Sequence, residues 1–266
     1  MFASLKQIFA RPAPADLPAI PAGQRVYAIG DVHGRLDLLD ALLATIAADE
    51  AGSAPAETTL VFLGDLIDRG PDSAGVIARV RDLQRRRDVR VLGGNHEEMF
   101  LASLQDTEVF RSLLKFGGKE TAWSFGVDHA AFRAAEMEEA QAMVRAAVPA
   151  DVVAWLQALE DMVAIGDYLF VHAGINPAVP LAEQSPRDLR WIREPFLSYA
   201  AAHPLMVVHG HTISEEPEER ANRIGIDTGA YRTGRLTALR LEGSDRRFLQ
   251  ASEQTIGDTA VVSVAP

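Results

Sequence analysis

The stretch GDLIDRGPDS at residues 64–73 follows the apolar run TLVFL at residues 59–63. A run of strand type therefore stops at a glycine, and two acids and a base come next, namely Asp65, Asp68 and Arg69. Charged side chains are costly to group beside a buried strand unless they bind something or one another. The stretch thus predicts a binding site at a strand end, and the same kind of ending occurs elsewhere in the chain.

Strand-type and helix-type patterns alternate over the first hundred residues. The apolar runs end in polar residues, and the segments between them carry apolar residues at helical spacing. The predicted strands lie at residues 25–31, 58–65 and 89–97, and the predicted helices at residues 36–50 and 72–87. This alternation is typical of a sheet with helices packed on it, so we expect an α/β fold.

The pattern changes in the second part of the chain. Residues 99–160 are mostly helical in pattern, and we interpret them as an insertion that caps one edge of the sheet. Strand-type runs with polar endings return at residues 168–174 and 204–212. Residues 223–243 predict two closing strands joined by a glycine turn.

We expect one domain at residues 25–245, preceded by a tail with a proline-rich linker (1–24) and followed by a C-terminal tail (246–266). The chain has 266 residues, 48% of them hydrophobic, which allows a substantial core. Its net charge of -11 predicts no binding to nucleic acids or anionic membranes. No apolar run approaches the roughly 20 residues of a membrane span. We therefore expect a cytoplasmic protein, and a monomer.

Polar residues suited to metal binding follow five of the predicted strands. Ligands of α/β folds bind beyond the carboxyl ends of strands, so these five endings predict one shared site. The chain has no cysteines, which leaves oxygen and imidazole ligands, and these suit Mn, Fe or Zn. The candidates are Asp31 and His33, then Asp65, Asp68 and Arg69, then Asn95, His96 and Glu97, then His172, and finally His209 and His211.

The spacing of these residues suits two metal ions. Asp31 and His33 lie two apart, share a side in extended geometry and could hold one ion. Asn95, His172 and a histidine of the HGH motif could hold a second, while the two oxygens of Asp65 could bridge both ions. Two ions about 3.5–4 Å apart can hold a hydroxide between them and promote its in-line attack on phosphorus.

The remaining polar residues suit phosphate chemistry. The guanidinium of Arg69 offers a bidentate fork to phosphate oxygens. His96 is adjacent to a proposed metal ligand, where it could protonate the leaving alkoxide, and Asp68 could hold its other ring nitrogen. We expect Glu97 to close the loop behind the site rather than to bind metal.

Five motifs contain these residues, namely GDVHG (30–34), GDLIDRG (64–70), GNHE (94–97), VHAG (171–174) and GHT (210–212). Their order and spacing resemble those of the phosphoprotein phosphatase branch of the metallophosphoesterases, over residues 25–242. The bacterial and phage members, which the chain resembles closely, include protein phosphatases and symmetrical diadenosine tetraphosphatases. The resemblance implies a calcineurin-like α/β fold, with a central β-sandwich flanked by helices and a dimetal site at the carboxyl ends of strands.

The resemblance also implies how the residues share two divalent ions, which we expect to be Mn²⁺, with Fe or Zn as alternatives. One ion would be bound by Asp31, His33 and Asp65. The other would be bound by Asp65, Asn95, His172 and His211. His211 is preferred over His209 because the glycine-flanked second histidine fits the family pattern.

The same resemblance assigns the residues that act on the substrate. Arg69 and Asn95 would bind phosphate, and His96 with Asp68 would supply the acid. A further phosphate-binding arginine is expected in LRWIREPF (189–196), where Arg193 is preferred over Arg190. The segment FGGKETAWSFG (116–126) resembles a glycine-threonine segment of the bacterial members, and we interpret it as structural.

We therefore expect a phosphatase that hydrolyses phosphomonoesters by direct attack of a metal-bridging hydroxide. The favoured substrates are phosphoserine and phosphothreonine in proteins, with phosphotyrosine also considered. The alternative is a symmetrical diadenosine tetraphosphatase or another nucleotide phosphohydrolase. A metal-binding scaffold without activity is disfavoured because the acid, arginine and ligand sets are complete. A nuclease is disfavoured because Ile213 stands where its GHxH motif requires histidine.

Overall fold

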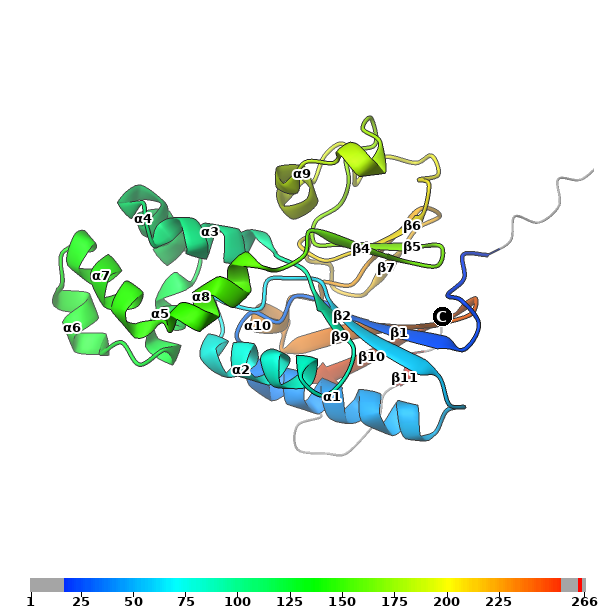
Figure 1. Ribbon diagram of the computed structural model, residues 1–266, viewed down its shortest axis with the longest axis horizontal. Helices are drawn as coiled ribbons and strands as arrows, with labels where there is room; N and C mark the ends of the chain where they lie inside the picture. Colours follow the sequence, from blue (N-terminus) through cyan, green and yellow to red (C-terminus); the bar gives the residue numbers. More distant parts are fainter. Residues whose placement is uncertain (1–16, 255–262, 265–266) are drawn as a thin grey trace, which may run out of the picture.

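The computed structural model describes residues 17–254 and 263–264 (Figure 1). The strands are β1 (Gln24–Ile29), β2 (Glu57–Phe62), β3 (Val89–Val91), β4 (Met162–Ile165), β5 (Tyr168–Val171), β6 (Met206–His209), β7 (Glu218–Glu219), β8 (Arg223–Gly225), β9 (Arg235–Glu242), β10 (Asp245–Ser252) and β11 (Ser263–Val264). The helices are α1 (Leu36–Ala51), α2 (Ser73–Gln84), α3 (Asn95–Ser103), α4 (Thr107–Lys115), α5 (Gly118–Ser124), α6 (His129–Ala134), α7 (Met137–Ala147), α8 (Ala150–Gln157), the 3-10 helix η1 (Leu181–Glu183), α9 (Pro186–Trp191) and α10 (Ala230–Thr233). Most of the expected N-terminal tail, and part of the expected C-terminal tail, lie outside the described residues.

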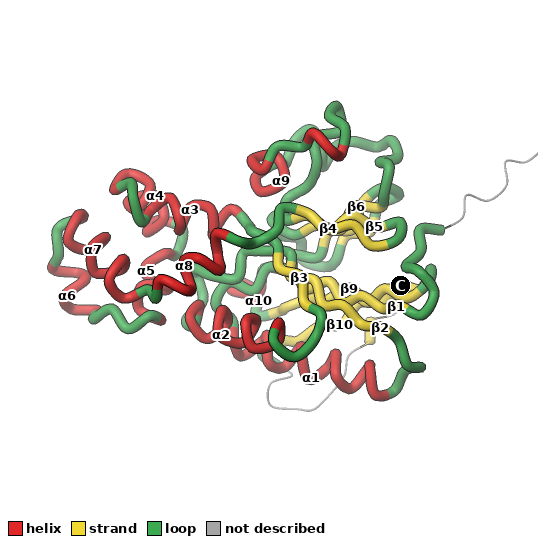
Figure 2. Tube along the Cα trace, viewed as in Figure 1, coloured by secondary structure: helices red, strands yellow, loops and turns green. Residues whose placement is uncertain are grey.

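The strands form two sheets that lie one above the other (Figure 2). The six-stranded sheet has the order β11-β10-β9-β1-β2-β3, and the five-stranded sheet has the order β4-β5-β6-β8-β7. β1, β2 and β3 run parallel to one another, as do β5, β6 and β8. Parallel pairing brings the carboxyl ends of neighbouring strands to the same edge of a sheet, which is where the predicted motifs begin.

Successive side chains of the central strands point alternately into two apolar cores, one on each face of the six-stranded sheet. In β1, Val26 and Ala28 belong to the apolar core between the two sheets, whereas Tyr27 and Ile29 belong to the core beneath the helices. β1 and β2 contribute to both cores, so they read as continuous apolar runs rather than as alternating ones. Helices α1 and α2 cover the outer face of the six-stranded sheet (Figure 1). The expected β-sandwich flanked by helices is therefore confirmed.

The predicted insertion consists of helices α3 to α8, which project from one end of the sandwich, at the left of Figure 1. The insertion is anchored where the chain leaves it, because Leu92 and Glu160 form an isolated parallel bridge. A third apolar cluster lies on the other face of the five-stranded sheet. There Leu189 and Phe196, from α9 and the loop that follows it, pack on that sheet.

The structure differs from the sequence-based expectation near the C-terminus. Residues 223–243 do contain two strands, but β8 and β9 belong to different sheets and are joined through α10 rather than by a tight glycine turn. The chain needs this longer connection because it must cross from one layer to the other. The six-stranded sheet also continues past residue 245, since β10 pairs with β9 from Asp245 to Ser252.

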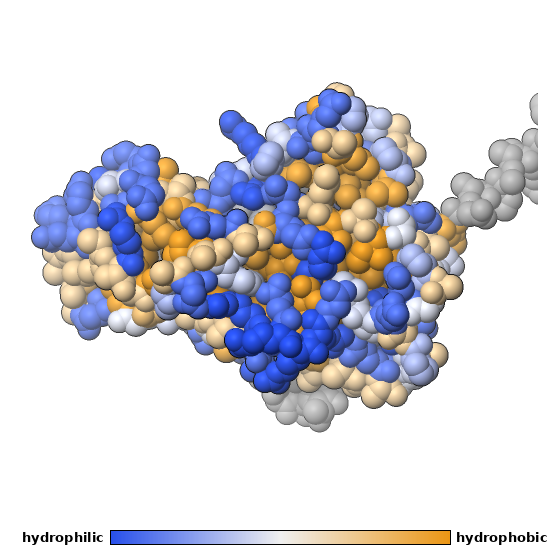
Figure 3. Space-filling view, in the orientation of Figure 1, coloured by the Kyte–Doolittle hydropathy of each residue, from blue (hydrophilic) through white to orange (hydrophobic). Residues whose placement is uncertain are grey.

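The surface is polar where α2 ends, and a strongly hydrophilic area lies there in Figure 3. Its arginines are paired with acids: Arg86 lies 2.9 Å from Asp82, and Arg87 lies 2.6 Å from Glu50. This area is therefore a mixture of charges rather than a basic patch. No helix in the described part of the chain is long and apolar enough to cross a bilayer.

Candidate metal centre and active-site pocket

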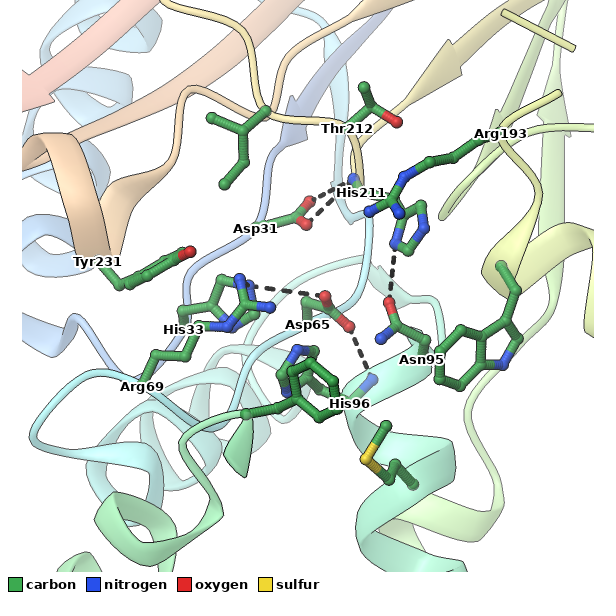
Figure 4. A pocket seen from close by; sticks show the side chains of 14 residues that line it. Asp31, His33, Asp65, Arg69, Asn95, His96, Arg193, His211, Thr212 and Tyr231 are labelled. Carbon is green, nitrogen blue, oxygen red and sulfur yellow. Dashed lines mark hydrogen bonds and ion pairs between the residues drawn. The ribbon is translucent and has the colours of Figure 1, made fainter. Parts of the chain in front are cut away.

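A pocket of about 500 Å³ lies beyond the carboxyl ends of the strands (Figure 4). It brings together most of the residues predicted from the sequence, which are Asp31, His33, Asp65, Arg69, Asn95, His96, Arg193 and His211. The two other predicted residues lie directly behind this lining. Asp68 is hydrogen-bonded to His96, and His172 contacts Asn95. The residues assigned to metal and phosphate binding therefore converge on one place, whereas His209, the alternative to His211, does not line the pocket and lies 3.2 Å from Nη1 of Arg223.

The loops that carry these residues have an unusual backbone. Among the described residues, the non-glycine residues with positive φ are His33, Asp65, Asp68, Arg69 and His211, at 46°, 48°, 70°, 72° and 62°. Side chains other than glycine rarely adopt this conformation, and each instance costs about 1–3 kcal/mol. Every one of these residues belongs to the predicted site. The turns that follow the strands are thus strained where they present their side chains.

Asp65 occupies the centre of the site. Its Oδ2 lies 3.6 Å from Nε2 of His33, and its Oδ1 lies 3.4 Å from Nε2 of His172. The backbone N–H of His96 donates to Oδ1 at 3.0 Å, which fixes the carboxylate in this orientation. One carboxylate therefore presents its two oxygens to two different histidines, as a bridging ligand must.

The two histidines are oriented by backbone carbonyls. Nδ1 of His33 donates to the carbonyl of Ile67 at 2.9 Å, and Nδ1 of His172 donates to the carbonyl of Leu63 at 2.8 Å. Each ring thus turns the lone pair of Nε2 towards Asp65, which is the arrangement that metal-binding histidines adopt. Burial lowers the pKa of His33 to about 3 and also lowers the pKa of His172, so both rings are neutral and can act as ligands.

A second histidine pair converges on Asn95. Nδ1 of His211 lies 2.8 Å from Oδ1 of Asn95, and Nε2 of His172 lies 3.1 Å from the same oxygen. The lone pair of His172 therefore faces an amide oxygen, which also accepts rather than donates. A cation between these groups would satisfy both of them.

Asp31 adds a second buried carboxylate to the pocket. Its oxygens accept hydrogen bonds from the backbone N–H of His211 at 3.0 and 3.2 Å. Burial and the nearby charges of Asp227 and Asp65 raise the pKa of Asp31 well above its ordinary value. Carboxylates that repel one another in a buried site require a positive partner to remain ionised.

Asp227 is a functional candidate that the sequence motifs do not reveal. It is buried, it accepts a hydrogen bond from the backbone N–H of Gly229 at 2.9 Å, and burial raises its pKa to about 6. It follows β8 closely, just as Asp31 follows β1 and Asp65 follows β2. The pattern of an acid after a short apolar strand was therefore present in the sequence.

These residues fit divalent metal ions. Two groups have ligand atoms that all lie within 4.8 Å of one another, His33 with Asp65 and His96, and Asp65 with His172 and His211. Both groups share Asp65, in agreement with its predicted bridging position. The first group differs from the implied ligand set because it contains His96, whereas the carboxylate of Asp31 is turned towards the N–H of His211. Neutral imidazoles beside buried carboxylates form a suitable donor set for a borderline divalent ion.

His96 is also paired with Asp68, as the sequence predicted. Oδ2 of Asp68 lies 2.7 Å from Nδ1 of His96, and the hydroxyl of Thr121 donates to Oδ1 of Asp68 at 2.6 Å. Burial alone would lower the pKa of His96, but the negative charges of Asp65 and Asp68 outweigh it and raise the pKa. His96 is therefore held in a form that can donate a proton.

The glycine-threonine segment supports this pair. The backbone N–H of Asp68 donates to the hydroxyl of Thr121 at 3.0 Å, and that of Arg69 donates to the carbonyl of Gly117 at 3.0 Å. A Cβ atom at Gly117 would lie 2.5 Å from the backbone nitrogen of Arg69, so only glycine permits this approach. The expected structural role of residues 116–126 thus has a physical basis.

Glu97 lies behind the site, as expected. Its carboxylate accepts hydrogen bonds from the backbone N–H groups of Asp65, Leu66 and Gly94 at 2.9, 2.7 and 2.8 Å. Burial, followed by the charge of Asp65, raises its pKa to about 7. Glu97 therefore joins two of the motif loops and does not face the pocket.

Arginines provide the positive charge of the pocket. Figure 4 shows Arg69 beside His33 and Arg193 beside His211. Nη1 of Arg69 lies 3.1 Å from Nε2 of His33, and its guanidinium carbon lies 4.5 Å from the ring centroid of Tyr231. Arg190 does not line the pocket, because it forms ion pairs with Glu98 and Asp161.

The rest of the pocket lining is largely apolar, and the strand-end pattern does not predict it. Its members are Met99, Phe116, Trp191, Thr212, Ile213 and Tyr231. They come from helices and loops, and reach the pocket through the packing of elements that are distant in sequence. Phe116, Trp191 and Thr212 do lie in quoted segments, namely 116–126, 189–196 and GHT, but none of the three is predicted there as a pocket residue.

Comparison with known proteins agrees with this geometry. Residues 24–232 match the model of the calcineurin-like phosphoesterase family. The chain is 30% identical over 230 residues to a serine/threonine-protein phosphatase 1 of Salmonella typhimurium, covering 82% of this chain and 93% of that protein. It is 28% identical over 248 residues to an asymmetrical bis(5'-nucleosyl)-tetraphosphatase of Bacillus velezensis, covering 84% of this chain and 92% of that protein.

The fold has a counterpart among solved structures. A crystal structure of a candidate diadenosine tetraphosphatase superimposes with a TM-score of 0.63 at 23% sequence identity, covering 90% of this chain and 100% of that chain. This likeness supports the fold and leaves the substrate open. With the family match spanning most of its length and the motif residues gathered in one pocket, the chain belongs to the calcineurin-like phosphoesterases and resembles the phosphoprotein phosphatases among them.

Proposed function

We propose that the protein is a phosphoprotein phosphatase, which hydrolyses phosphomonoesters of serine, threonine or tyrosine side chains. One observation carries this proposal: a single pocket combines a metal-binding cluster centred on Asp65, two arginines and a buried His96–Asp68 pair. This combination provides separate groups to activate water, to bind the phosphoryl oxygens and to protonate the leaving group.

Two divalent ions, which we propose to be Mn²⁺, would be held by Asp31, His33, Asp65, Asn95, His172 and His211. When bound, they would increase the acidity of water and neutralise the charge of the phosphoryl group. Arg69 and Arg193 would hold the phosphoryl oxygens from two sides, because both line the pocket.

His96 would protonate the leaving oxygen of the substrate. It contacts Asp68 through Nδ1, which leaves Nε2 available on the pocket side, and it is one of the lining residues. Asp68 would act through His96, by orienting the ring and stabilising its positive charge. No residue needs to form a covalent bond to phosphorus in this scheme.

A second candidate function is hydrolysis of dinucleoside tetraphosphates. It is favoured by the relatives with that activity in their names, such as the asymmetrical enzyme of Bacillus velezensis and a symmetrical enzyme of Acidovorax. The Acidovorax match is 31% identical over 179 residues, and covers 66% of this chain but only 48% of that protein. We rank this function second because the asymmetrical enzyme, whose match is as long as that of the protein phosphatase, is slightly less identical at 28% against 30%, and the symmetrical enzyme is covered only to 48%.

The decisive test compares substrates on one preparation. Protein loaded with Mn²⁺ would be assayed on phosphoserine and phosphotyrosine peptides and on diadenosine tetraphosphate, with kcat/KM measured for each. Our proposal expects the larger kcat/KM for a phosphopeptide. A larger value for diadenosine tetraphosphate would replace it with the second function, and the absence of hydrolysis of all three would refute both.

A further inference from the structure

Exposed aromatic rings lie at the rim of the active-site pocket. Among the described residues, the exposed large apolar side chains are Leu17, Phe116 and Trp191, with exposed fractions of 66%, 50% and 36%. Two of these three line the pocket, Phe116 after α4 and Trp191 at the end of α9. Apolar side chains that are exposed together at the mouth of a pocket are candidates for contact with a ligand.

Both rings are connected to the proposed catalytic residues, one through the backbone and one through a hydrogen bond. Phe116 immediately precedes Gly117, whose carbonyl holds the backbone N–H of Arg69 at 3.0 Å. Nε1 of Trp191 donates to Oε1 of Glu98 at 3.2 Å, and Glu98 lies in α3, the helix that begins with Asn95 and His96. These contacts therefore fix the positions of both rings with respect to the groups that would bind the phosphoryl group and cleave its ester bond.

We propose that Phe116 and Trp191 form an aromatic rim that selects aryl phosphates, and hence phosphotyrosine among the phosphorylated side chains of proteins. This inference rests on the phosphatase function proposed above. With the phosphoryl group among the metal cluster and the arginines, the group directly attached to the ester oxygen occupies the mouth of the pocket. In phosphotyrosine that group is a phenyl ring, which can contact both aromatic side chains. In phosphoserine it is a single methylene, which would leave the rim exposed to water.

The charges around the rim favour this occupant over a nucleotide. An apolar groove next to the pocket shares Met99 and Trp191 with it, and this groove also contains Glu98 and Glu108. Arg190 lies 3.1 Å from Glu98 and 2.7 Å from Asp161, and Arg111 lies 3.6 Å from Glu108, so three carboxylates are paired with two cations. A polyphosphate chain that extended over Trp191 would meet net negative charge, whereas the ring of tyrosine is neutral.

The test measures the preference for a ring rather than total activity. Two peptides of the same sequence, one with phosphotyrosine and one with phosphoserine, would be hydrolysed by the Mn²⁺-loaded full chain. The variants are Phe116→Ala, Trp191→Ala and the ring-preserving Trp191→Phe. Leu17→Ala is the matched control, because it removes the third exposed apolar side chain, which does not line the pocket.

We expect kcat/KM of the wild type to be higher for the phosphotyrosine peptide. Phe116→Ala and Trp191→Ala should each lower the phosphotyrosine-to-phosphoserine ratio by about threefold to tenfold, as expected for one lost aromatic contact. Trp191→Phe and Leu17→Ala should keep the wild-type ratio. An unchanged ratio in both alanine variants would refute the aromatic rim, and so would a wild type that prefers phosphoserine.

A binding experiment separates this inference from the proposed function. Calorimetry on the same proteins would compare phenylphosphonate with methylphosphonate, which are not hydrolysed and differ only in the ring. Tighter binding of phenylphosphonate that is lost in Phe116→Ala supports the rim even if neither peptide is hydrolysed. Equal affinities for the two phosphonates would refute the rim even if the protein is an active phosphatase. Circular dichroism checks that each variant is folded. If Trp191→Ala unfolds, Phe116→Ala still tests the rim, because it removes a ring that is half exposed.

Discussion

Oδ2 of Asp68 lies 2.7 Å from Nδ1 of His96, and both side chains are buried. The other oxygen of Asp68 accepts from the hydroxyl of Thr121 at 2.6 Å, so the carboxylate cannot turn away from the histidine. His96 is thereby held with its second nitrogen on the side of the pocket. This relationship separates the group that would donate the proton from the group that orients the donor.

The first prediction concerns the donor itself. His96→Asn should lower kcat on a phosphomonoester by about 100-fold or more, because general acid catalysis is lost. The amide should leave the carboxylate of Asp65 in place, since the backbone N–H of residue 96, which donates to Asp65, is kept in this variant. Metal content measured by mass spectrometry should therefore remain close to that of the wild type. Full activity in His96→Asn would remove this residue from the acid role.

The second prediction concerns the orienting residue. Asp68→Asn should lower kcat by about tenfold, and the loss should disappear when His96 is already replaced, because Asp68 acts only through it. The measurement is kcat for the two single variants and the double variant. If Asp68→Asn reduced the activity of the His96→Asn protein by the same factor as that of the wild type, Asp68 would have an independent role.

The third prediction concerns metal binding and stability. One Mn²⁺ site filled at 100 times its Kd should stabilise the fold by about 2.7 kcal/mol and raise Tm by about 5–10 °C, and a second site filled to the same degree should add a similar amount. The ions would relieve repulsion among the buried carboxylates of Asp31, Asp65 and Asp227, since burial and neighbouring negative charge raise the pKa of Asp31 and of Asp227 and so oppose their ionisation. Thermal unfolding with and without Mn²⁺ measures this gain.

A matched pair of variants locates the metal effect. Asp65→Asn should abolish most of the rise in Tm, because it replaces the carboxylate shared by both ligand groups. Glu57→Gln removes an equal charge at the exposed start of β2 and should keep the full rise. An equal rise in the Asp65→Asn protein would place the metal ions elsewhere.

The fourth prediction concerns Tyr231. The guanidinium carbon of Arg69 lies 4.5 Å from the centroid of the Tyr231 ring. The Tyr231 ring also contacts the ring of His33, with centroids 5.2 Å apart. Tyr231→Leu should weaken the binding of inorganic phosphate by about fivefold, because a cation–π contact of about 1 kcal/mol is lost. The measurement is the inhibition constant of phosphate as a product inhibitor. Tyr231→Phe keeps the ring and should behave as the wild type. The effect should be absent when Arg69 is replaced by alanine, and its persistence there would contradict a role through Arg69.

Most of the site could be predicted because its signal is local. An apolar run followed by glycine and an acid identifies the end of a strand, so Asp31 and Asp65 are visible in the sequence, and parallel pairing then brings them together. Asp227 also follows a strand closely, but Ile226 separates it from Gly225, so the glycine-acid signal is missing after β8. The orientation of the Asp31 carboxylate towards His211 depends on the crossing of two distant loops, which no local pattern encodes.

The parts that could not be predicted depend on tertiary packing. Phe116 and Trp191 have no strand-end signal, and they reach the pocket only because the helical insertion and α9 pack on either side of it. Strand β10 is similarly obscure, because Arg246 and Arg247 interrupt its apolar pattern. It is a strand because the hairpin with β9 provides its hydrogen bonds from Asp245 to Ser252.

The positive φ angles of the site have a consequence for protein engineering. Replacing His33, Asp65, Asp68, Arg69 or His211 with glycine would relieve about 1–3 kcal/mol of backbone strain at each position, yet each change would delete a proposed catalytic or ligand group. Where this relief exceeds the lost side-chain contacts and the greater freedom of glycine in the unfolded chain, selection for heat resistance alone would favour substitutions that abolish activity. Stabilising libraries for this protein should hold these five codons constant and sample the sandwich and the helical insertion instead.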